Sequence, residues 1–290
     1  MLRALGREAG AESDIRKGAS GAMGAQRSGL GGSARAGRCY FRRLPAWALP
    51  PMPLHSIRPL PGGAHLGLWH LTETPLALWP QLSAPDAYRP LLPARADVPR
   101  QAQWLAGRVL VQRMLAAVAP DSVGLLLHND ATGRPFLASG PDLGPAVSLS
   151  HSGEWVAALL APAGAAVGVD VEVVRDKALR IARKFLTPEE LTANELIINS
   201  QPTLAIELFS LLWSAKETLY KLAGQRGIIF RQNLLLDLPA PPTPPATWPS
   251  AGELSARLEL AGRSSRHRIC YFQPAGGYVL TYCYSLPSLT

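Results

Sequence analysis

The segment Ala166–Val174 constrains the possible folds of this chain most strongly. It reads Ala-Val-Gly-Val-Asp-Val-Glu-Val-Val, and β-branched residues at every second position predict a β-strand. Such a strand directs its valines to one face and directs Asp170 and Glu172 to the other, with the carboxylates roughly 6–7 Å apart. Two neighbouring carboxylates repel each other unless a cation lies between them. The pair therefore indicates either a solvated acidic strand face or a site where oxygen ligands bind a divalent cation.

A second segment, Leu212–Leu222, is rich in good helix formers and contains neither Pro nor Gly, so it predicts a helix. On that helix Glu217 and Lys221 lie one turn apart on one face, with Trp213 one turn before them. An ion pair at the surface is the ordinary interpretation of this spacing. Here Trp213 and Tyr220 flank the pair and a second acidic pair precedes it in the chain. These two features favour a functional site.

Further polar residues suit phosphate binding. The turn Gly133–Pro135 carries an Arg, which is either an ordinary surface residue or a guanidinium directed at a phosphate. The run Ser148–Ser152 contains three hydroxyls and an imidazole, which either satisfy backbone groups at a strand end or bind a ligand. A Ser-His nucleophile is not favoured, because the Gly-x-Ser-x-Gly turn is absent. Lys216 points about 100° away from Glu217 on a helix, toward a phosphate or toward water.

From Met52 onward the pattern mixes helices and strands. We expect strands at His65–Leu71, Val123–Leu127, Val147–Gly153, Trp155–Leu160, Leu254–Leu260, Arg268–Phe272 and Tyr278–Ser285, in addition to the strand at 166–174. We expect helices at Pro99–Val118, Arg175–Phe185, Pro188–Asn199 (after a capping box at Thr187–Glu190) and Ala205–Leu222, with a turn at Asn129–Pro135 and a proline-rich connector at Pro239–Pro249. Both halves contain an early strand, helices and a late cluster of strands, which suggests a duplicated α+β unit.

The first 51 residues differ in composition from the rest. They hold eight Arg and one Lys against three acidic residues, so they carry +6 of the net charge of +8. We expect them to be a disordered basic extension. A transit peptide, a nucleic-acid-binding arm and an upstream extension from a misplaced start codon compete as its origin. The last is favoured, with Met52 as the start, which leaves 290 minus 51, or 239, residues.

Cysteine usage and hydropathy narrow the class of protein. Cys39, Cys270 and Cys283 form no CxxC pair, so neither a disulfide framework nor a zinc site is expected. The sequence contains no run of eighteen apolar residues and no secretory signal, so we expect no transmembrane helix and a cytoplasmic location.

Taken together, the motifs resemble a known family. Gly168–Glu172 and, about forty residues later, Trp213–Lys221 resemble the paired signature of the 4'-phosphopantetheinyl transferase superfamily. Each half alone is unspecific, but both in this order and spacing are specific. The resemblance extends from about Met52 to the C-terminus and, with 239 residues, favours the large, surfactin-type branch. It implies an α+β fold in which two similar lobes, residues 52–165 and 166–290, form a pseudo-dimer with the active site and coenzyme A in the cleft between them.

The resemblance also implies roles for individual residues. Asp170, Glu172 and Glu217 would be ligands of Mg²⁺ or Mn²⁺, and Glu217 and Lys221 would be catalytic. The residues expected to bind coenzyme A are Gly133, Arg134, Ser150, His151, Lys216 and Lys221. Family members often carry a phosphate-contacting basic residue in this region (89–113), but the sequence does not assign that role to Arg100 or to Arg108, and a solvated helix face is expected for both.

The implied activity is that of a holo-carrier-protein synthase. It transfers the 4'-phosphopantetheine arm of coenzyme A to a serine of an apo acyl or peptidyl carrier protein and releases adenosine 3',5'-bisphosphate. Glu217 would act as base, metal ligand or both. A monomer without nucleic-acid or membrane partners is expected. A non-catalytic coenzyme A or carrier-protein binding module is the alternative, and it would be favoured if Asp170 or Glu217 were missing. A third interpretation, a nucleic-acid-binding protein, rests only on the basic tail and the net charge.

Overall fold

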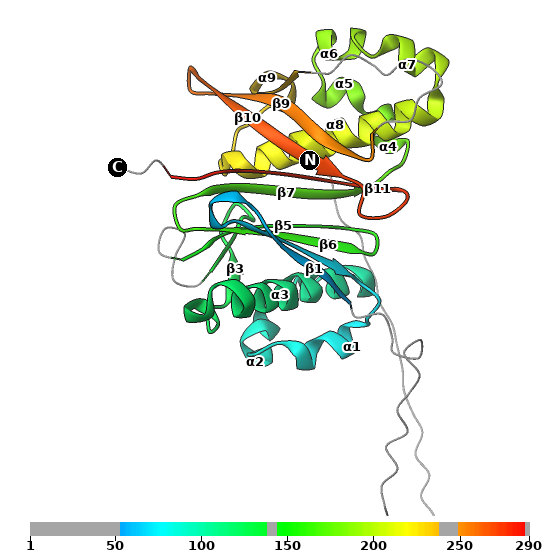
Figure 1. Ribbon diagram of the computed structural model, residues 1–290. Coiled ribbons are helices and arrows are strands. Elements are labelled where there is room, and N and C mark those ends of the chain that lie inside the picture. Colours follow the sequence, from blue (N-terminus) through cyan, green and yellow to red (C-terminus); the bar gives the residue numbers. More distant parts are fainter. Residues whose placement is uncertain (1–52, 138–143, 238–248, 288–290) are drawn as a thin grey trace, which may run out of the picture. The chain divides into compact units, whose positions relative to one another are not determined.

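Antiparallel strands form the centre of the fold in the computed structural model, which describes residues 53–137, 144–237 and 249–287 (Figure 1). The strands are β1 (Leu54–Pro59), β2 (His65–His70), β3 (Leu127–Asn129), β4 (Pro135–Leu137), β5 (Ala146–Ser152), β6 (Trp155–Ala161), β7 (Ala166–Val173), β8 (Leu234–Asp237), β9 (Ala251–Leu260), β10 (Arg263–Phe272) and β11 (Tyr278–Ser285). One sheet has the order β1-β2-β6-β5, a second has the order β7-β11-β10-β9-β8, and β3 pairs with β4.

Helices accompany both large sheets. They are α1 (Pro75–Leu78), α2 (Pro85–Tyr88), α3 (Val98–Val118), α4 (Lys177–Arg180), α5 (Ala182–Phe185), α6 (Pro188–Thr192), α7 (Glu195–Ser200), α8 (Pro202–Ala223) and α9 (Phe230–Asn233), with short 3-10 turns at Pro61–Gly63, Trp79–Gln81, Arg89–Leu91 and Pro120–Ser122. Antiparallel sheets with separate helices make an α+β fold, as predicted. Among the described residues no helix combines the length and the apolar composition that a membrane span requires.

The described residues lie within one compact unit, residues 50–290, and pack as layers (Figure 1). Helix α3 covers one face of the four-stranded sheet, and α8 covers one face of the five-stranded sheet. A third apolar cluster joins the two sheets and includes Val167, Val169 and Val171 of β7. The predicted valine face of β7 is therefore confirmed, and each of these buried side chains contributes about 1.5–3 kcal/mol to folding.

Local signals set the ends of the two long helices. Asp97 caps α3, where its side chain accepts a hydrogen bond from Arg100 N at 2.9 Å, and Pro120 follows its end. Helix α8 ends at Gly224, whose φ of 61° places it in the left-handed region that glycine tolerates. Both helices match the predicted ranges closely.

Several predicted elements need correction. The strand expected at Val123–Leu127 is wrong, because a 3-10 turn precedes it and β3 begins only at Leu127. The helix expected through Asn199 is broken after α6, where the Asn194 side chain donates to Glu190 O at 2.7 Å and competes with the helical pattern. The capping box at its start is confirmed. The helix at 175–185 is two short helices, α4 and α5.

Other sequence predictions lie outside the described residues or stay predictions. The basic extension and residues 239–248 of the proline-rich connector belong to the first group. The four-stranded sheet draws its strands from residues 54–161, and the five-stranded sheet draws its strands from residues 166–285. The division into lobes at 52–165 and 166–290, the pseudo-twofold duplication and the cleft stay predictions.

Candidate active site

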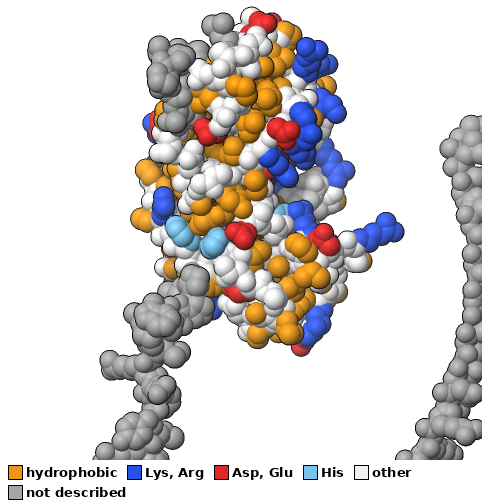
Figure 2. Space-filling model, turned by 90° about the vertical axis from the view of Figure 1, so that its right-hand side faces the viewer, with side chains coloured by type: hydrophobic (Ala, Val, Ile, Leu, Met, Phe, Trp, Pro, Cys, Tyr) orange, Lys and Arg blue, Asp and Glu red, His pale blue; other side chains and the backbone are white. Residues whose placement is uncertain are grey.

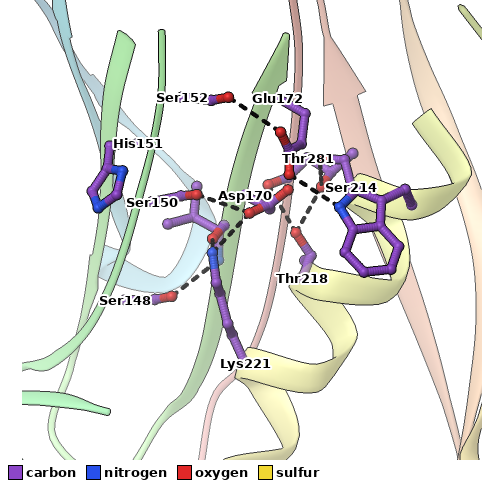
Figure 3. Close-up of polar contacts among 12 residues, drawn as sticks. Ser148, Ser150, His151, Ser152, Asp170, Glu172, Ser214, Thr218, Lys221 and Thr281 are labelled. Carbon is purple, nitrogen blue, oxygen red and sulfur yellow. Dashed lines mark hydrogen bonds and ion pairs between the residues drawn. The ribbon is translucent and has the colours of Figure 1, made fainter. Parts of the chain in front are cut away.

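Strand β7 and helix α8 lie in direct contact because residue 168 is glycine. A Cβ atom at this position would lie 2.1 Å from Thr218 O and 3.0 Å from Leu222 N, so any larger residue would force the two elements apart. The contact brings the acidic face of the strand to the helix. Lys221 Nζ consequently lies 2.8 Å from Asp170 Oδ1 (Figure 3). It also lies 2.9 Å from Val169 O.

Buried hydroxyls hold the helix in register behind this ion pair. Thr281 of β11 lies opposite Asp170 in the sheet. Its Oγ1 is 2.9 Å from Ser214 Oγ and 2.6 Å from Thr218 Oγ1, which also donates to Thr281 O at 3.1 Å (Figure 3). Because all three residues are almost completely buried, a slip of the helix would leave hydroxyl groups without partners.

The serines of β5 connect the two large sheets. In the described sheets β5 and β7 are edge strands that pair with β6 and β11. Ser148 Oγ accepts from Val169 N at 3.1 Å, and Ser150 Oγ donates to Asp170 Oδ1 at 2.8 Å. Ser152 Oγ donates to Glu172 Oε2 at 3.1 Å (Figure 3). It also accepts a hydrogen bond from Val173 N at 3.3 Å. Side chains thus replace the backbone ladder that edge strands lack.

The carboxylates on this face are buried close together. Asp170 is 3% exposed, so the alternative of a solvated acidic face is wrong for it. Burial and the charge of Asp170 raise the pKa of Glu172. Burial raises the pKa of Glu217 to about 7, with a further contribution from Asp170 and an opposing one from Lys221. The site therefore concentrates negative charge that a cation or a proton would stabilise.

Within the described residues, the expected metal ligands are not arranged as a complete metal site, but one of them has a carboxylate oxygen free to bind a cation. Among the described side chains, no group of three or more His, Cys, Asp or Glu is arranged to hold a metal ion. Even so, in this part of the chain Asp170 Oδ2 is buried without a hydrogen-bond partner, and Glu172 and Glu217 lie close enough to respond to its charge. An orphaned carboxylate oxygen among further carboxylates fits the chemistry of a hard divalent cation.

A cavity of about 180 Å³ opens beside the ion pair. Glu217, Tyr220 and Lys221 of α8 line it together with Arg134 and Ser148. Residues 130–134 form the predicted turn, in which Gly133 adopts a φ of 90°. The Arg134 guanidinium packs on the end of α8, since a Cβ on Gly224 would lie 2.5 Å from its Nη1. Two predicted coenzyme A-binding residues, Gly133 and Arg134, therefore line the same cavity as Glu217 and Lys221.

A second cavity of about 210 Å³ carries positive charge. It shares Gly133, Pro135 and Leu149 with the first cavity, so the two adjoin. Arg100, Arg108, Ser150 and His151 line it with Trp104, Asn129 and others. His151 Nδ1 lies 3.1 Å from Arg100 Nη1. Burial, then the charge of Arg100, lowers the pKa of His151 to about 4, so the imidazole is neutral at pH 7.

Arg108 was not among the predicted site residues. Its side chain was expected on a solvated helix face, but it is only 5% exposed, with Cζ 3.4 Å from the centre of the Trp104 ring and Nη2 donating to Asn129 Oδ1 at 2.8 Å. Burial lowers its pKa to about 9, and its Nε is buried without a partner among the described residues. The spacing from Trp104 to Arg108, one helical turn, was the available signal. Arg100 is exposed, as expected.

Lys216 requires a further correction. Neither a phosphate contact nor a solvated position fits, because the side chain is completely buried. Its ammonium lies 2.6 Å from Glu190 Oε2 and 2.9 Å from Phe185 O. Glu190 Oε1 in turn accepts from Leu236 N at 2.8 Å. The Lys216 side chain thus points away from the cavity and joins α8 to α5, α6 and β8.

A comparison with known protein families matches the stretch of chain that carries β7 and α8. Residues 166–283 match the family described as the 4'-phosphopantetheinyl transferase superfamily. The match covers the stretch that contains the motifs in β7 and α8, in agreement with the resemblance that these motifs predicted.

Individual relatives agree with this assignment. The chain is 30% identical to a 4'-phosphopantetheinyl transferase of Bacillus subtilis over 122 residues, which are 42% of this chain and 51% of that protein. It is 35% identical to the 4'-phosphopantetheinyl transferase AcpT of Salmonella typhi over 130 residues, 44% of this chain and 60% of that protein. It is also 30% identical over 158 residues to the 4'-phosphopantetheinyl transferase psf-1 of Bacillus pumilus, 54% and 61% of the two chains. The matches thus span between about half and three fifths of these relatives.

Proposed function

We propose that the protein transfers the 4'-phosphopantetheine arm of coenzyme A to a serine of an apo carrier protein. The observation that carries the proposal is that Glu217 and Lys221 line one cavity while two arginines line the cavity adjoining it. The first cavity offers a base and a fixed ammonium group, and the second offers charge for phosphate groups. The family match and the names of the relatives support the same reaction.

Glu217 is the candidate base. In the reaction the serine oxygen forms a bond to the phosphorus that carries the pantetheine arm, and the bond from that phosphorus to the oxygen of adenosine 3',5'-bisphosphate breaks. The serine proton passes to Glu217. A carboxylate with a pKa of about 7 is a stronger base than an ordinary carboxylate and is about half ionised at neutral pH. Its position on α8 directs it to the cavity that also receives Lys221.

Lys221 would stabilise the phosphoryl group. Two of its three N–H donors bond to Val169 O and Asp170 Oδ1, which orients the ammonium group. The side chain is 26% exposed and lines the cavity, so a third donor remains for a phosphate oxygen. A donor held in place before the reaction stabilises developing charge without the cost of reorganising it.

A Mg²⁺ ion, or Mn²⁺ in its place, completes the proposed site. Asp170, through its unpartnered Oδ2, would hold it together with Glu172 and Glu217. When bound, the ion neutralises pyrophosphate charge and polarises the phosphoryl group. Glu217 is therefore proposed both as base and as an additional ligand, and a carboxylate has two oxygens for the two tasks.

Coenzyme A would occupy both cavities. The guanidinium groups of Arg100 and Arg108 supply the positive charge of the second cavity, and neutral His151 supplies a hydrogen bond. Arg134 and Lys221 face the first cavity, where the pyrophosphate and the reacting phosphorus would lie. Arg suits phosphate through its fork of donors. This arrangement removes Lys216 from the expected set of coenzyme A-binding residues and adds Arg100 and Arg108.

The carrier protein would approach from the side of Glu172. Exposed basic residues follow it in the chain, just before α4 and on α4 and α5: Arg175, Lys177, Arg180, Arg183 and Lys184. Figure 2 shows Lys and Arg side chains gathered at one side of the face that includes α4. A small pocket lined by Glu172, Arg175, Lys177 and Trp213 connects this basic surface to the site. Such a surface favours an acidic protein partner, because complementary charge guides association.

The test is incubation of the protein with coenzyme A, Mg²⁺ and several apo carrier proteins, read by intact mass. One phosphopantetheine arm should be added to the acceptor serine. Glu217→Gln should lose turnover by roughly 10²–10⁴-fold, whereas Glu207→Gln, on the same helix, should remain active. Binding of coenzyme A without transfer to any carrier would instead support the alternative of a non-catalytic binding module.

A further inference from the structure

Trp213 has contacts that a core residue does not need. It lies on α8 one turn before Glu217, and its indole Nε1 donates a hydrogen bond to Glu172 Oε1 at 3.0 Å. The side chain is only half-buried, and it borders the small pocket that Glu172 and Arg175 also line. The proposed reaction above assigns no task to Trp213.

The two hydrogen bonds to Glu172 come from neutral groups on different elements. Trp213 of α8 bonds to Oε1, and Ser152 of β5 bonds to Oε2 at 3.1 Å. Asp170, in contrast, is paired with the ammonium group of Lys221. An indole N–H is a donor only and carries no charge. Both oxygens of Glu172 are therefore held in place while its negative charge is left uncompensated by these two partners.

Aromatic rings on two sides fix the indole. Phe185 of α5 contacts it edge-on, with ring centres 5.1 Å apart and an interplanar angle of 75°. Phe230 of α9 stacks on it at 5.6 Å and 23°, and Phe230 also contacts Tyr220 at 5.4 Å. Such aromatic pairs are favourable beyond the burial of their surface. The indole N–H thus has a defined direction before any ligand binds.

We propose that Trp213 is a positioning residue that holds the Glu172 carboxylate in the orientation required to bind a divalent cation. This inference rests on the proposed transferase function and on the assignment of Glu172 as a ligand. It is carried by the 3.0 Å hydrogen bond, by the neutral character of both donors to Glu172, and by the aromatic contacts that fix the ring. Partners that orient ligands typically contribute roughly 10–100-fold to metal affinity.

The test compares Trp213→Phe with Trp69→Phe. Phenylalanine keeps an aromatic ring against Phe185 and Phe230 but lacks the N–H donor. Trp69, on β2 of the four-stranded sheet, is a matched control. It is 2% exposed, and its Nε1 also donates to a carboxylate, Glu73 Oε2, at 3.3 Å. Three quantities are measured for wild type and both variants: the Mg²⁺ concentration at half-maximal transfer rate, the KM for coenzyme A, and Mn²⁺ binding without coenzyme A by electron paramagnetic resonance.

Trp213→Phe should need roughly 10–100-fold more Mg²⁺ and bind Mn²⁺ correspondingly more weakly, with little change in the KM for coenzyme A and recovery of rate at high Mg²⁺. Trp69→Phe should retain the wild-type metal dependence. Unchanged metal dependence in Trp213→Phe would overturn the inference, as would an equal loss in both variants. If the wild-type protein transfers nothing, the proposed function fails; if it transfers and Trp213→Phe matches it, only this inference fails.

Discussion

Replacing Glu217 by Gln is expected to make the folded protein more stable at pH 8 while it removes transfer activity. Burial first, and then the charge of Asp170, raises the pKa of Glu217 from 4.5 to about 7 against the opposing effect of Lys221. An acid whose pKa is higher in the folded chain than in the unfolded chain binds more protons when folded between these two values. Its contribution to stability is therefore complete below pH 4.5 and is lost as the pH rises through 7.

The magnitude follows from the difference between the two pKa values. The interval from 4.5 to about 7, at about 1.4 kcal/mol for each pH unit, corresponds to about 3 kcal/mol. Because Glu217 is half-buried and borders a cavity, solvent screening lowers this value, and we expect a gain of about 1–3 kcal/mol in the free energy of unfolding for Glu217→Gln above pH 7. Gln does not ionise, so it avoids the cost that the wild-type carboxylate carries.

The assay is urea-induced unfolding of both proteins between pH 4.5 and 8, with a chelator present so that no metal offsets the carboxylate charges. The difference in unfolding free energy should be near zero at pH 4.5, rise through pH 6 and level off above pH 7. Glu207→Gln removes the same charge ten residues earlier on α8, about 15 Å away. Its effect at pH 8 should be smaller than that of Glu217→Gln.

Two results would refute this reasoning. A Glu217→Gln protein that is less stable than wild type at pH 8 would mean that the carboxylate is favourably placed in the folded state. A difference that does not vary between pH 4.5 and 8 would mean that Glu217 ionises alike in the folded and unfolded chains. In either case the buried position of Glu217 beside Asp170 would be wrong. Loss of turnover together with a gain in stability would separate damage to the reaction from misfolding.

Three further predictions test the surroundings of the site. Gly168→Ala places a Cβ 2.1 Å from Thr218 O and should lower the unfolding free energy by about 3 kcal/mol in urea unfolding; a change within error would contradict the close strand–helix contact. Lys216→Met leaves Glu190 buried without its cation and should lower the free energy of unfolding by about 3–5 kcal/mol. The double variant, in which Glu190→Gln is added, should regain part of this loss; equal stability of the single and double variants would exclude the buried ion pair. Arg108→Gln should weaken coenzyme A binding in calorimetry by about 1.5–3 kcal/mol, whereas Arg113→Gln, an exposed residue on the same helix, should bind normally; equal affinities would remove Arg108 from the site.

The sequence by itself determined the two elements that carry the site. The alternating valines of β7 and the helix-forming composition of α8 act over a few residues, so local patterns were sufficient to predict both. The faces followed from the same periodicities, which placed Asp170 beside Glu172 and Glu217 one turn from Lys221. Where local signals competed, prediction failed, as at Asn194, whose side chain bonds to the backbone and ends a helix.

Only the tertiary structure decided which polar groups became partners. Lys216 pairs with Glu190, which lies 26 positions earlier in the chain, and so it is a core residue despite its place in the motif. Arg108 is buried against Trp104 and Asn129, and Ser150 bonds to Asp170 across two sheet edges. A hydrogen bond or ion pair needs its atoms within about 3 Å, and only the path of the whole chain brings residues so distant in sequence to that separation.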